Sequence, residues 1–452
     1  MSTKAALVLA AGKGTRMHSD RPKVLQTVLG EPMLAVVLAA LEPEFGEEIF
    51  IVAGHRHELV EQAIPNGRFV LQKEQLGTGH ALREAMPALK ASGAESVLVV
   101  NGDAPLVTAE VIRDFVAQAQ KADLAFATIN LDNPGSYGRV VRQDGHIAGI
   151  VEAKDYDEAK YGVSTGEVNA GLYLIRMDLA ERLLPRVGNA NRSGEYYITD
   201  LVALALEDGA KVKGIVCGND ESLLGVNSPL ELAGAERMLQ ERVNRALLAS
   251  GVILHSPETV RISPFASIEP GAEITGPCEV TGRTRVGSGA RIFANCVIRD
   301  AQIDGGCEIR PFTHVEQAHV SQGALVGPYS RLRPGAHIDV EAHVGNFVEL
   351  KKSHLGPGAK ANHLSYLGDA EIGAGTNIGA GTITCNYDGR NKFKTAIGAH
   401  AFIGSNTALV APVSVGDNAT VGAGSTITKD VPEGELAVAR EKQKNLGKYP
   451  KK

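Results

Sequence analysis

Beyond residue 251 the chain carries an aliphatic residue at nearly every sixth position, and this period restricts the possible folds more than any other feature. Hexapeptide repeats are the signature of a parallel β-helix, in which each repeat forms one side of a triangular coil and Gly or Ala relieves crowding at the corners. Three sides take about 18 residues, so residues 252–437 should form about ten coils. The aliphatic positions are Ile262, Ile268, Ile274, Val280, Val286, Ile292 and Ile298; Ile303, Ile309 and Val315; Val320, Val326, Leu332, Ile338, Val344 and Leu350; and Ile397, Ile403, Leu409, Val415, Val421 and Ile427.

One segment interrupts the repeat. Residues 385–395 carry no six-residue period, so we expect them to leave the coil as a loop. A long ordered loop on a regular scaffold is more often functional than not. This loop is therefore a candidate part of a site.

The first half of the chain follows a different pattern. Short apolar runs alternate with amphipathic segments such as Thr108–Lys121, which predicts an α/β fold with a mostly parallel sheet. The predicted strands are Ala6–Ala10, Glu48–Val52, Ser96–Val100 and Leu124–Ile129.

A helix start separates the two patterns. Ser228, Pro229 and Glu231 form a capped helix start, and apolar residues at helical spacing continue it to about Ala249. We therefore expect an α/β domain over 1–227, a linker helix over 228–250, and a β-helix domain with a C-terminal tail over 251–452.

Composition excludes several classes of protein. Hydrophobic residues make up 44% and charged residues 22%, as in ordinary globular domains. No signal segment and no apolar stretch of about 18 residues is present, so we expect a cytoplasmic protein without a membrane span. A net charge of −6 does not favour nucleic-acid binding. The cysteines lie far apart without a C-x-x-C pair, so we expect buried small side chains rather than zinc ligands or disulfides: Cys217, Cys278, Cys296, Cys307 and Cys385.

A glycine-rich turn follows the first strand. In Leu9–Met17, small residues allow backbone N–H groups to approach phosphate oxygens, and Arg16 and Lys23 can offset the remaining charge. The order is not that of a P-loop, and the third glycine of the dinucleotide fingerprint is missing. The alternative is an ordinary structural turn.

An aspartate follows another strand. Asp103 comes after Asn101 and Gly102 at the carboxyl end of Ser96–Val100, where open α/β sheets bind ligands and where a carboxylate can hold Mg²⁺. Alone, it could be a turn residue. Combined with the glycine-rich turn and Pro22-Lys23, it closely resembles the nucleoside triphosphate:sugar-1-phosphate nucleotidyltransferases.

The resemblance extends over essentially the whole chain to the bifunctional enzymes of UDP-N-acetylglucosamine synthesis. It is carried by Gln72, Glu74–Ala81, Tyr137–Arg139, Ile150–Glu152, Val168–Gly171 and Gly225–Asn227. It implies Mg²⁺ on Asp103 and Asn227, UTP as substrate, and catalytic roles for Arg16 and Lys23. The implied UDP-sugar-binding residues are Leu9, Ala10, Ala11, Gly12, Lys23, Gln72, Gly77, Thr78, Asn101, Gly102, Asp103, Gly138, Glu152, Asn169 and Asn227. Asn101 stands where some relatives carry Tyr.

A second site is expected near the loop. An amine that attacks a thioester must lose a proton, and the imidazole of His363 suits that work, although a plain surface histidine is the alternative. The segment Lys360–Gly368 resembles the hexapeptide acyltransferases, which implies that His363 is catalytic and that Asn386 orients it. The resemblance assigns Arg333, Lys351, Tyr366 and Asn377 to glucosamine-1-phosphate, and Ala380, Asn386, Tyr387, Ser405, Ala423 and Arg440 to acetyl-CoA. It also implies a left-handed β-helix and a homotrimer with sites between subunits; the usual preference for right-handed crossovers would give the opposite hand.

Three functions are compatible with these features. The first is a bifunctional enzyme that acetylates glucosamine-1-phosphate and then uridylylates the product, supplying precursors of peptidoglycan and lipopolysaccharide. The second is a nucleotidyltransferase whose β-helix only assembles subunits or binds regulators. The third is a non-catalytic scaffold. His363 and the loop favour the first, because an assembly rod needs neither.

Overall fold

The computed structural model describes residues 3–12, 14–217 and 223–447 and divides the chain into two compact units, 1–239 and 240–452. No helix in these described ranges combines the length and the apolar character needed to cross a membrane. The helix α8 (Pro229–Ala249) lies within the segment 228–250, and the division between the two units falls inside it.

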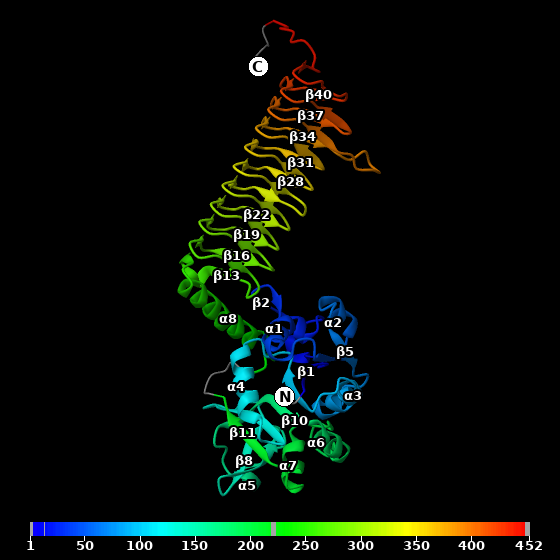
Figure 1. Ribbon diagram of the computed structural model, residues 1–452, viewed down its shortest axis with the longest axis vertical. Coiled ribbons are helices and arrows are strands. Elements are labelled where there is room, and N and C mark those ends of the chain that lie inside the picture. The colour runs from blue at the N-terminus through cyan, green and yellow to red at the C-terminus, as the bar shows by residue number, and fades with distance from the viewer. Residues whose placement is uncertain (1–2, 13, 218–222, 448–452) are drawn as a thin grey trace. The chain divides into compact units, whose positions relative to one another are not determined.

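The N-terminal unit is built on one mixed sheet (Figure 1). Its main path is β11 (Val212–Val216), β7 (Leu124–Asn130), β10 (Glu167–Arg176), β6 (Ser96–Asn101), β1 (Lys4–Ala10), β4 (Ile49–Ala53) and β5 (Arg68–Leu71). All neighbours are parallel except β10, which runs antiparallel to β6 and β7. A hairpin of β8 (Arg139–Gln143) and β9 (His146–Val151) pairs with β10. The predicted α/β fold with a mostly parallel sheet is confirmed, and its arrangement is Rossmann-like.

Two apolar layers sandwich this sheet because side chains alternate along each strand. Ala5 and Leu7 face one cluster, and Ala6 and Val8 face the other. The helices of this unit are α1 (Met33–Phe45), α2 (His57–Ala63), α3 (Thr78–Ala91), α4 (Ala109–Ala119), α5 (Glu158–Tyr161), α6 (Met177–Leu183) and α7 (Asp200–Glu207). With both faces covered, the carboxyl ends of β1 and β6 are left as the place where polar groups gather.

The C-terminal unit is a left-handed parallel β-helix with three sheets along its length. Within the described residues one sheet has 11 strands, from β12 (Ile253–His255) to β41 (Leu436–Ala437). A second has 10, from β13 (Val260–Ile262) to β40 (Thr426–Ile427), and a third has 9, from β14 (Ser267–Ile268) to β38 (Val413–Val415). These ladders agree with the expected number of coils.

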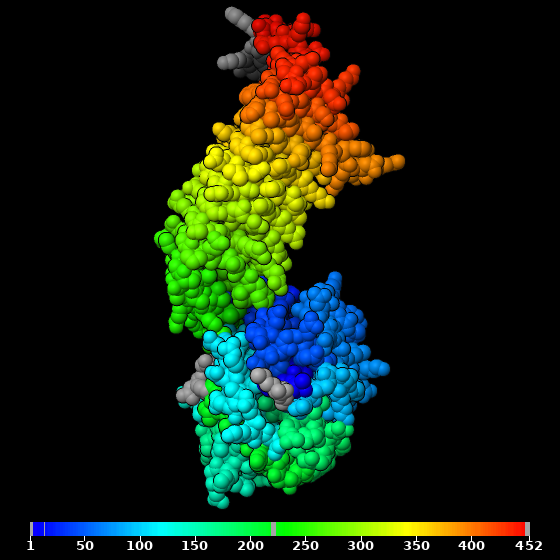
Figure 2. Space-filling model, in the orientation of Figure 1, coloured from blue at the N-terminus to red at the C-terminus, as the bar shows by residue number. Residues whose placement is uncertain are grey.

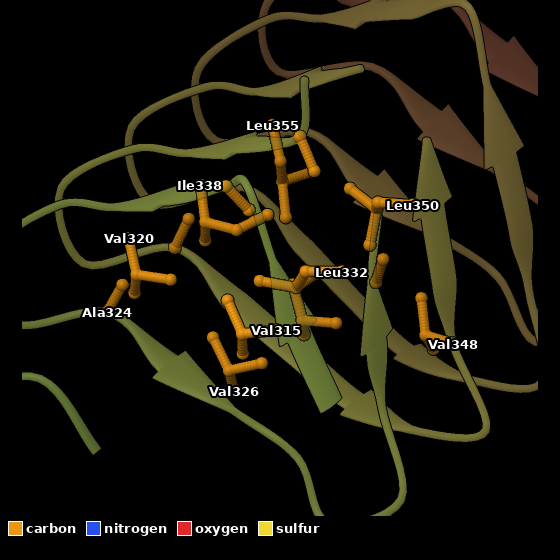
Figure 3. Close-up of a cluster of buried hydrophobic side chains, with 14 of the residues drawn as sticks. Val315, Val320, Ala324, Val326, Leu332, Ile338, Val348, Leu350 and Leu355 are labelled. Carbon is orange, nitrogen blue, oxygen red and sulfur yellow. The ribbon is translucent and has the colours of Figure 1, made fainter. Parts of the chain in front are cut away.

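The aliphatic residues of the repeat fill the interior of the coils, as Figure 3 shows for one stretch. Val315, Leu332 and Leu350, for example, occupy aligned positions in successive coils and are fully buried. Each inward side chain therefore packs on its counterparts above and below, which stabilises a narrow prism without a second layer.

The coils also continue through residues 355–384. Leu355, Leu367, Ile372 and Ile378 are buried there and keep the spacing of the repeat, with a slip of one residue before Ile372. Ala361 and Thr384 take inward positions there, and both are buried. The Thr384 hydroxyl is satisfied in the interior because it accepts a hydrogen bond from Gly368 N (2.8 Å). At these two positions, a small side chain and a hydrogen-bonded hydroxyl thus replace large aliphatic side chains.

The interruption after this stretch is a loop, as predicted. It spans the residues between β34 (Ile383–Cys385) and β35 (Thr395–Ile397) and projects from the stack of coils (Figures 1 and 2). The cysteine prediction is only partly confirmed. Cys278, Cys296 and Cys307 are buried, but Cys217 and Cys385 are partly exposed.

Candidate functional site

A cleft of about 440 Å³ opens at the carboxyl ends of β1 and β6. It brings together most of the residues predicted to bind the nucleotide: Leu9, Ala11, Gly12, Lys23, Gln72, Gly77, Thr78, Asn101 and Asp103. Gly14, Thr15, Val24, Gln75, Ala81 and Glu195 complete the wall. The cleft therefore lies where a parallel sheet is expected to bind a ligand.

Two glycines of the glycine-rich turn have different surroundings. Gly12 faces open space, so its backbone is accessible from the cleft. Gly14 has a φ of +60° and lies so close to Lys23 that an added Cβ would come within 2.6 Å of the Lys23 Cβ. Arg16, in the short 3-10 helix Thr15–Met17, is exposed beside this wall. The turn therefore presents accessible backbone to the cleft, and Lys23 adds a cation to its wall, whereas Arg16 is not one of the lining residues.

Lys23 joins two of the predicted site residues. Its ammonium forms an ion pair with Asp103 Oδ2 and donates a hydrogen bond to Asn227 Oδ1 (3.1 Å). Asn227 is held in turn, because its backbone N–H donates to Glu231 Oε2 (2.6 Å). Residues far apart in the sequence thus converge around one positive charge.

The second carboxylate oxygen of Asp103 is buried without a hydrogen-bond partner. A buried, unpaired carboxylate oxygen is unfavourable unless a cation or donor meets it, and carboxylate and amide oxygens are ligands that Mg²⁺ prefers. Asp103 and Asn227 therefore fit a divalent ion. Across the described ranges, no three His, Cys, Asp or Glu side chains cluster in a way that could hold a metal ion, so an ion here would also rely on substrate oxygens or water.

A smaller cleft of about 170 Å³ adjoins the first and shares Leu9, Thr78 and Asn101 with it. It contains three more of the predicted UDP-sugar-binding residues: Gly138, Glu152 and Asn169. The Thr199 hydroxyl donates to Glu152 Oε1 (3.1 Å). Burial raises the pKa of Glu152, although the Thr199 hydrogen bond opposes the rise. The Glu152 carboxyl group is thus held in one orientation as a hydrogen-bond acceptor in a pocket that is largely shielded from water.

In the β-helix, four of the predicted acetyl-CoA residues follow one edge of the prism, whereas Asn386 and Tyr387 lie in the loop. Ala380, Ser405 and Ala423 occupy equivalent corner positions in successive coils. The Ala380 carbonyl accepts a hydrogen bond from the N–H of Asn406, the residue after Ser405, and the Ser405 carbonyl accepts one from the N–H of Gly424, the residue after Ala423. His363 has the same position one coil earlier, since its carbonyl accepts from Gly381 N (3.4 Å). Arg440 donates to the Ala423 carbonyl at the other end. The edge therefore forms a continuous track that begins at an imidazole and ends at a cation.

A group of cations lies on an adjoining sheet. Lys351 is in β28 (Glu349–Lys351), and Arg333 follows β25 (Arg331–Leu332) and donates to Glu349 Oε1 (2.8 Å). The neighbouring Lys392 ammonium lowers the pKa of Lys351, and Arg333 adds to the effect. Because Lys351 and Lys392 repel one another, an anion between them would be bound favourably.

Tyr366 lies on the same sheet, in β31 (Tyr366–Gly368), and is the register partner of Glu349. Gly368 has no room for a Cβ, because Tyr366 Oη and Asn386 Nδ2 lie against it. Asn377, by contrast, is in β33 (Asn377–Ile378), which belongs to a different sheet. A single chain therefore gathers three of the four predicted acceptor residues on one face.

The structure does not support orientation of His363 by Asn386. The amide of Asn386 donates to Asp369 Oδ2 (2.5 Å), and the partner of the His363 ring is Asn346. Tyr387, 60% exposed, donates to Gly389 O (2.7 Å) within the loop.

Sequence reasoning missed several residues of these sites. Thr199 had no motif, and Asn346 and Asp369 are separated from their partners by a coil of 17 residues. Lys392 could have been found, because it lies in the loop that interrupts the repeat.

Comparisons with known proteins agree with both halves. Residues 6–153 match the MobA-like NTP transferase domain, and residues 394–429 match the hexapeptide repeat of succinyl-transferase. The chain is 59% identical to the "Bifunctional protein GlmU" of Nitratidesulfovibrio vulgaris over 100% of this chain and 99% of that protein. It is 54% identical to the protein of the same name from Oleidesulfovibrio alaskensis, over 99% and 98% of the two chains.

Among solved structures, the inositol-1-phosphate CTP transferase of T. maritima aligns with a TM-score of 0.42 at 18% identity, covering 53% of this chain and 96% of that one. The identity and coverage shared with full-length relatives, together with the two domain matches, show that the chain belongs to the GlmU family of bifunctional proteins.

Proposed function

We propose that the chain makes UDP-N-acetylglucosamine in two transfers, each performed by one of its two units. The β-helix transfers acetyl from acetyl-CoA to glucosamine-1-phosphate, and the α/β unit then transfers uridylyl from UTP to the product. The observation that carries the proposal is the track headed by His363, because a rod used only for assembly has no need of it. The products supply precursors of peptidoglycan and lipopolysaccharide.

In uridylyl transfer, a phosphate oxygen of N-acetylglucosamine-1-phosphate attacks the α-phosphorus of UTP in line. The new P–O bond forms as the bond to the bridging oxygen breaks, and pyrophosphate leaves with that oxygen. The attacking phosphate is already anionic, so no protein nucleophile is needed and catalysis consists of positioning and charge compensation. Lys23 and Arg16 supply cations; Asp103 and Asn227 would hold Mg²⁺, which offsets phosphate charge when bound.

In acetyl transfer, the amine of glucosamine-1-phosphate attacks the thioester carbonyl. His363 accepts the amine proton, and the CoA thiolate leaves and is protonated. Arg333, Lys351 and Tyr366 bind the phosphate of the acceptor. Acetyl-CoA then lies along the edge formed by Ala380, Ser405 and Ala423, with Asn386, Tyr387 and Arg440 completing its site.

Assembly through the β-helix would bring Asn377 to the acceptor. Asn377 is on a different sheet from Lys351 and Tyr366, so a site between subunits accounts for its expected role. An exposed stack of Phe312, Tyr329 and Phe347, with ring centroids 4.8 and 5.5 Å apart, supports burial of this surface against another copy. We take the assembly to be a homotrimer in the cytoplasm; light scattering of the purified protein tests the trimer.

Two assays on purified protein test the proposed function. The first follows CoA release from acetyl-CoA with glucosamine-1-phosphate, and the second follows pyrophosphate release from UTP with N-acetylglucosamine-1-phosphate and Mg²⁺. His363→Ala should abolish only the first activity and Asp103→Ala only the second. Pyrophosphate release without CoA release in the unaltered protein would reduce the β-helix to assembly or regulation. Loss of both activities from a folded single variant would show that the two sites are not independent.

A further inference from the structure

We infer that Asn346 is a positioning residue for acetyl transfer: its side-chain oxygen fixes the ring orientation and the tautomer of His363. The inference rests on the proposed role of His363 as the base. Asn346 ends β27 (His343–Asn346) and His363 ends β30 (Lys360–His363), and the two are register partners in adjacent parallel strands. Asn346 Oδ1 lies 3.1 Å from His363 Nδ1.

This contact decides which ring nitrogen carries the proton. An amide oxygen only accepts hydrogen bonds, so neutral His363 must donate from Nδ1, and the lone pair is then on Nε2. Nε2 is the nitrogen left to accept a proton from an amine. An amide turned the other way would place NH₂ against Nδ1, put the ring proton on Nε2 and prevent it from acting as a base there.

The position of Asn346 is fixed by its backbone. Its carbonyl accepts from Leu364 N (3.1 Å), and the neighbouring Gly345 carbonyl accepts from Ser330 Oγ (2.6 Å). Gly345 has no room for a Cβ, because the Asn362 carbonyl lies against it. A side chain attached to such a rigid strand end can hold its partner in one orientation.

His363 depends on this contact. Its side chain is exposed, and within the described ranges Asn346 Oδ1 is the side-chain atom that lies within hydrogen-bond distance of its ring. The pair is also specific to this level of the edge. In the coil before Asn346, the Tyr329 carbonyl accepts from the N–H of Phe347, and in the coil after His363, the His363 carbonyl accepts from the N–H of Gly381, which follows Ala380. The neighbouring positions on this edge are therefore not asparagines, and Asn346 does not belong to a structural asparagine ladder.

Two variants of Asn346 separate positioning from mere stability. Asn346→Ala removes the acceptor, so kcat for acetyl transfer should fall about five- to tenfold, the usual effect of one hydrogen bond, with little change in KM for either substrate. Asn346→Asp keeps the shape and the acceptor but adds a negative charge that stabilises the imidazolium. The acid limb of its kcat/KM profile should therefore move up by about one pH unit, with activity above that limb partly restored relative to Asn346→Ala.

The controls use the same protein. Gln302→Ala removes a comparable amide contact, 2.9 Å to Asp304, on another sheet and should leave both activities unchanged. Pyrophosphate release by each variant reports on the integrity of the whole chain. An unshifted acid limb in Asn346→Asp, together with kcat within twofold of wild type in Asn346→Ala, would overturn the inference. If His363→Ala instead retained acetyl transfer, the proposed function itself would fail, whatever the Asn346 variants do.

Discussion

Gly225 lies against the Asp103 carboxylate, and its replacement by Ala tests the proposed metal site without replacing a metal ligand. The backbone of Gly225 has no positive φ, so Ala is conformationally allowed. Its Cβ would lie 2.6 Å from Asp103 Oδ1, whereas ordinary contacts begin near 3.4 Å, so the carboxylate must move by about 0.8 Å. A misplacement of about 1 Å in a catalytic group can reduce a rate by about 10²-fold, or about 2.7 kcal/mol in the activation free energy.

The assay is pyrophosphate release measured over a range of Mg²⁺ concentrations. Gly225→Ala should lose about 10²-fold in kcat/KM and require more Mg²⁺, while CoA release by the same preparation stays normal. Gly188→Ala is the matched control, because a Cβ there meets nothing within 4 Å. Uridylyl transfer within twofold of wild type at every Mg²⁺ concentration would refute the argument that the Asp103 carboxylate must stay where the structure places it.

Three further predictions concern stability. Burial raises the pKa of Asp200 to about 6, so the free energy of unfolding should fall as pH rises from about 4 to 6. Asp200→Asn should raise the free energy of unfolding by about 1 kcal/mol at pH 7, after screening by solvent, and should leave it unchanged at pH 4. Denaturant titrations at the two pH values measure this difference. Leu332→Ala should lower the free energy of unfolding by about 2–5 kcal/mol, because Leu332 is fully buried. Leu248 is 45% exposed, so Leu248→Ala should lower it far less in the same measurement. Burial lowers the pKa of His354, but hydrogen bonds to carboxylates outweigh it and raise the pKa; Glu371→Gln should therefore lower the melting temperature below pH 6.5 and not well above it.

Much of the first site could be predicted from sequence because its parts are tied to strand ends. The glycine-rich turn follows β1 and Asp103 follows β6, and parallel neighbouring strands bring such ends to one edge of a sheet. The pairing of Lys23 with Asn227 could not be predicted in the same way. These residues are 204 positions apart, and the path of the intervening chain decides whether they meet.

In the β-helix too, the sequence predicts the elements but not which side chains of neighbouring coils meet. Most of its coils have 17 or 18 residues, so the residue that stacks on His363 depends on every slip before it. Asn346 meets His363 because that coil has 17 residues, and Asn386 likewise meets Asp369 rather than the imidazole. In residues 355–384, only Ala361 and Thr384 depart from the aliphatic period, because they fill inward positions without a large aliphatic group.

By itself, then, the sequence determined the two architectures and the residue types available for chemistry, because hydrophobic periodicity and glycine placement are local properties of the chain. Only the tertiary structure decided which polar side chains face one another: Lys23 between Asp103 and Asn227, and Asn346 beside His363. The physical reason is that a hydrogen bond requires atoms within about 3 Å, a distance set by the register between elements and not by the pattern within one.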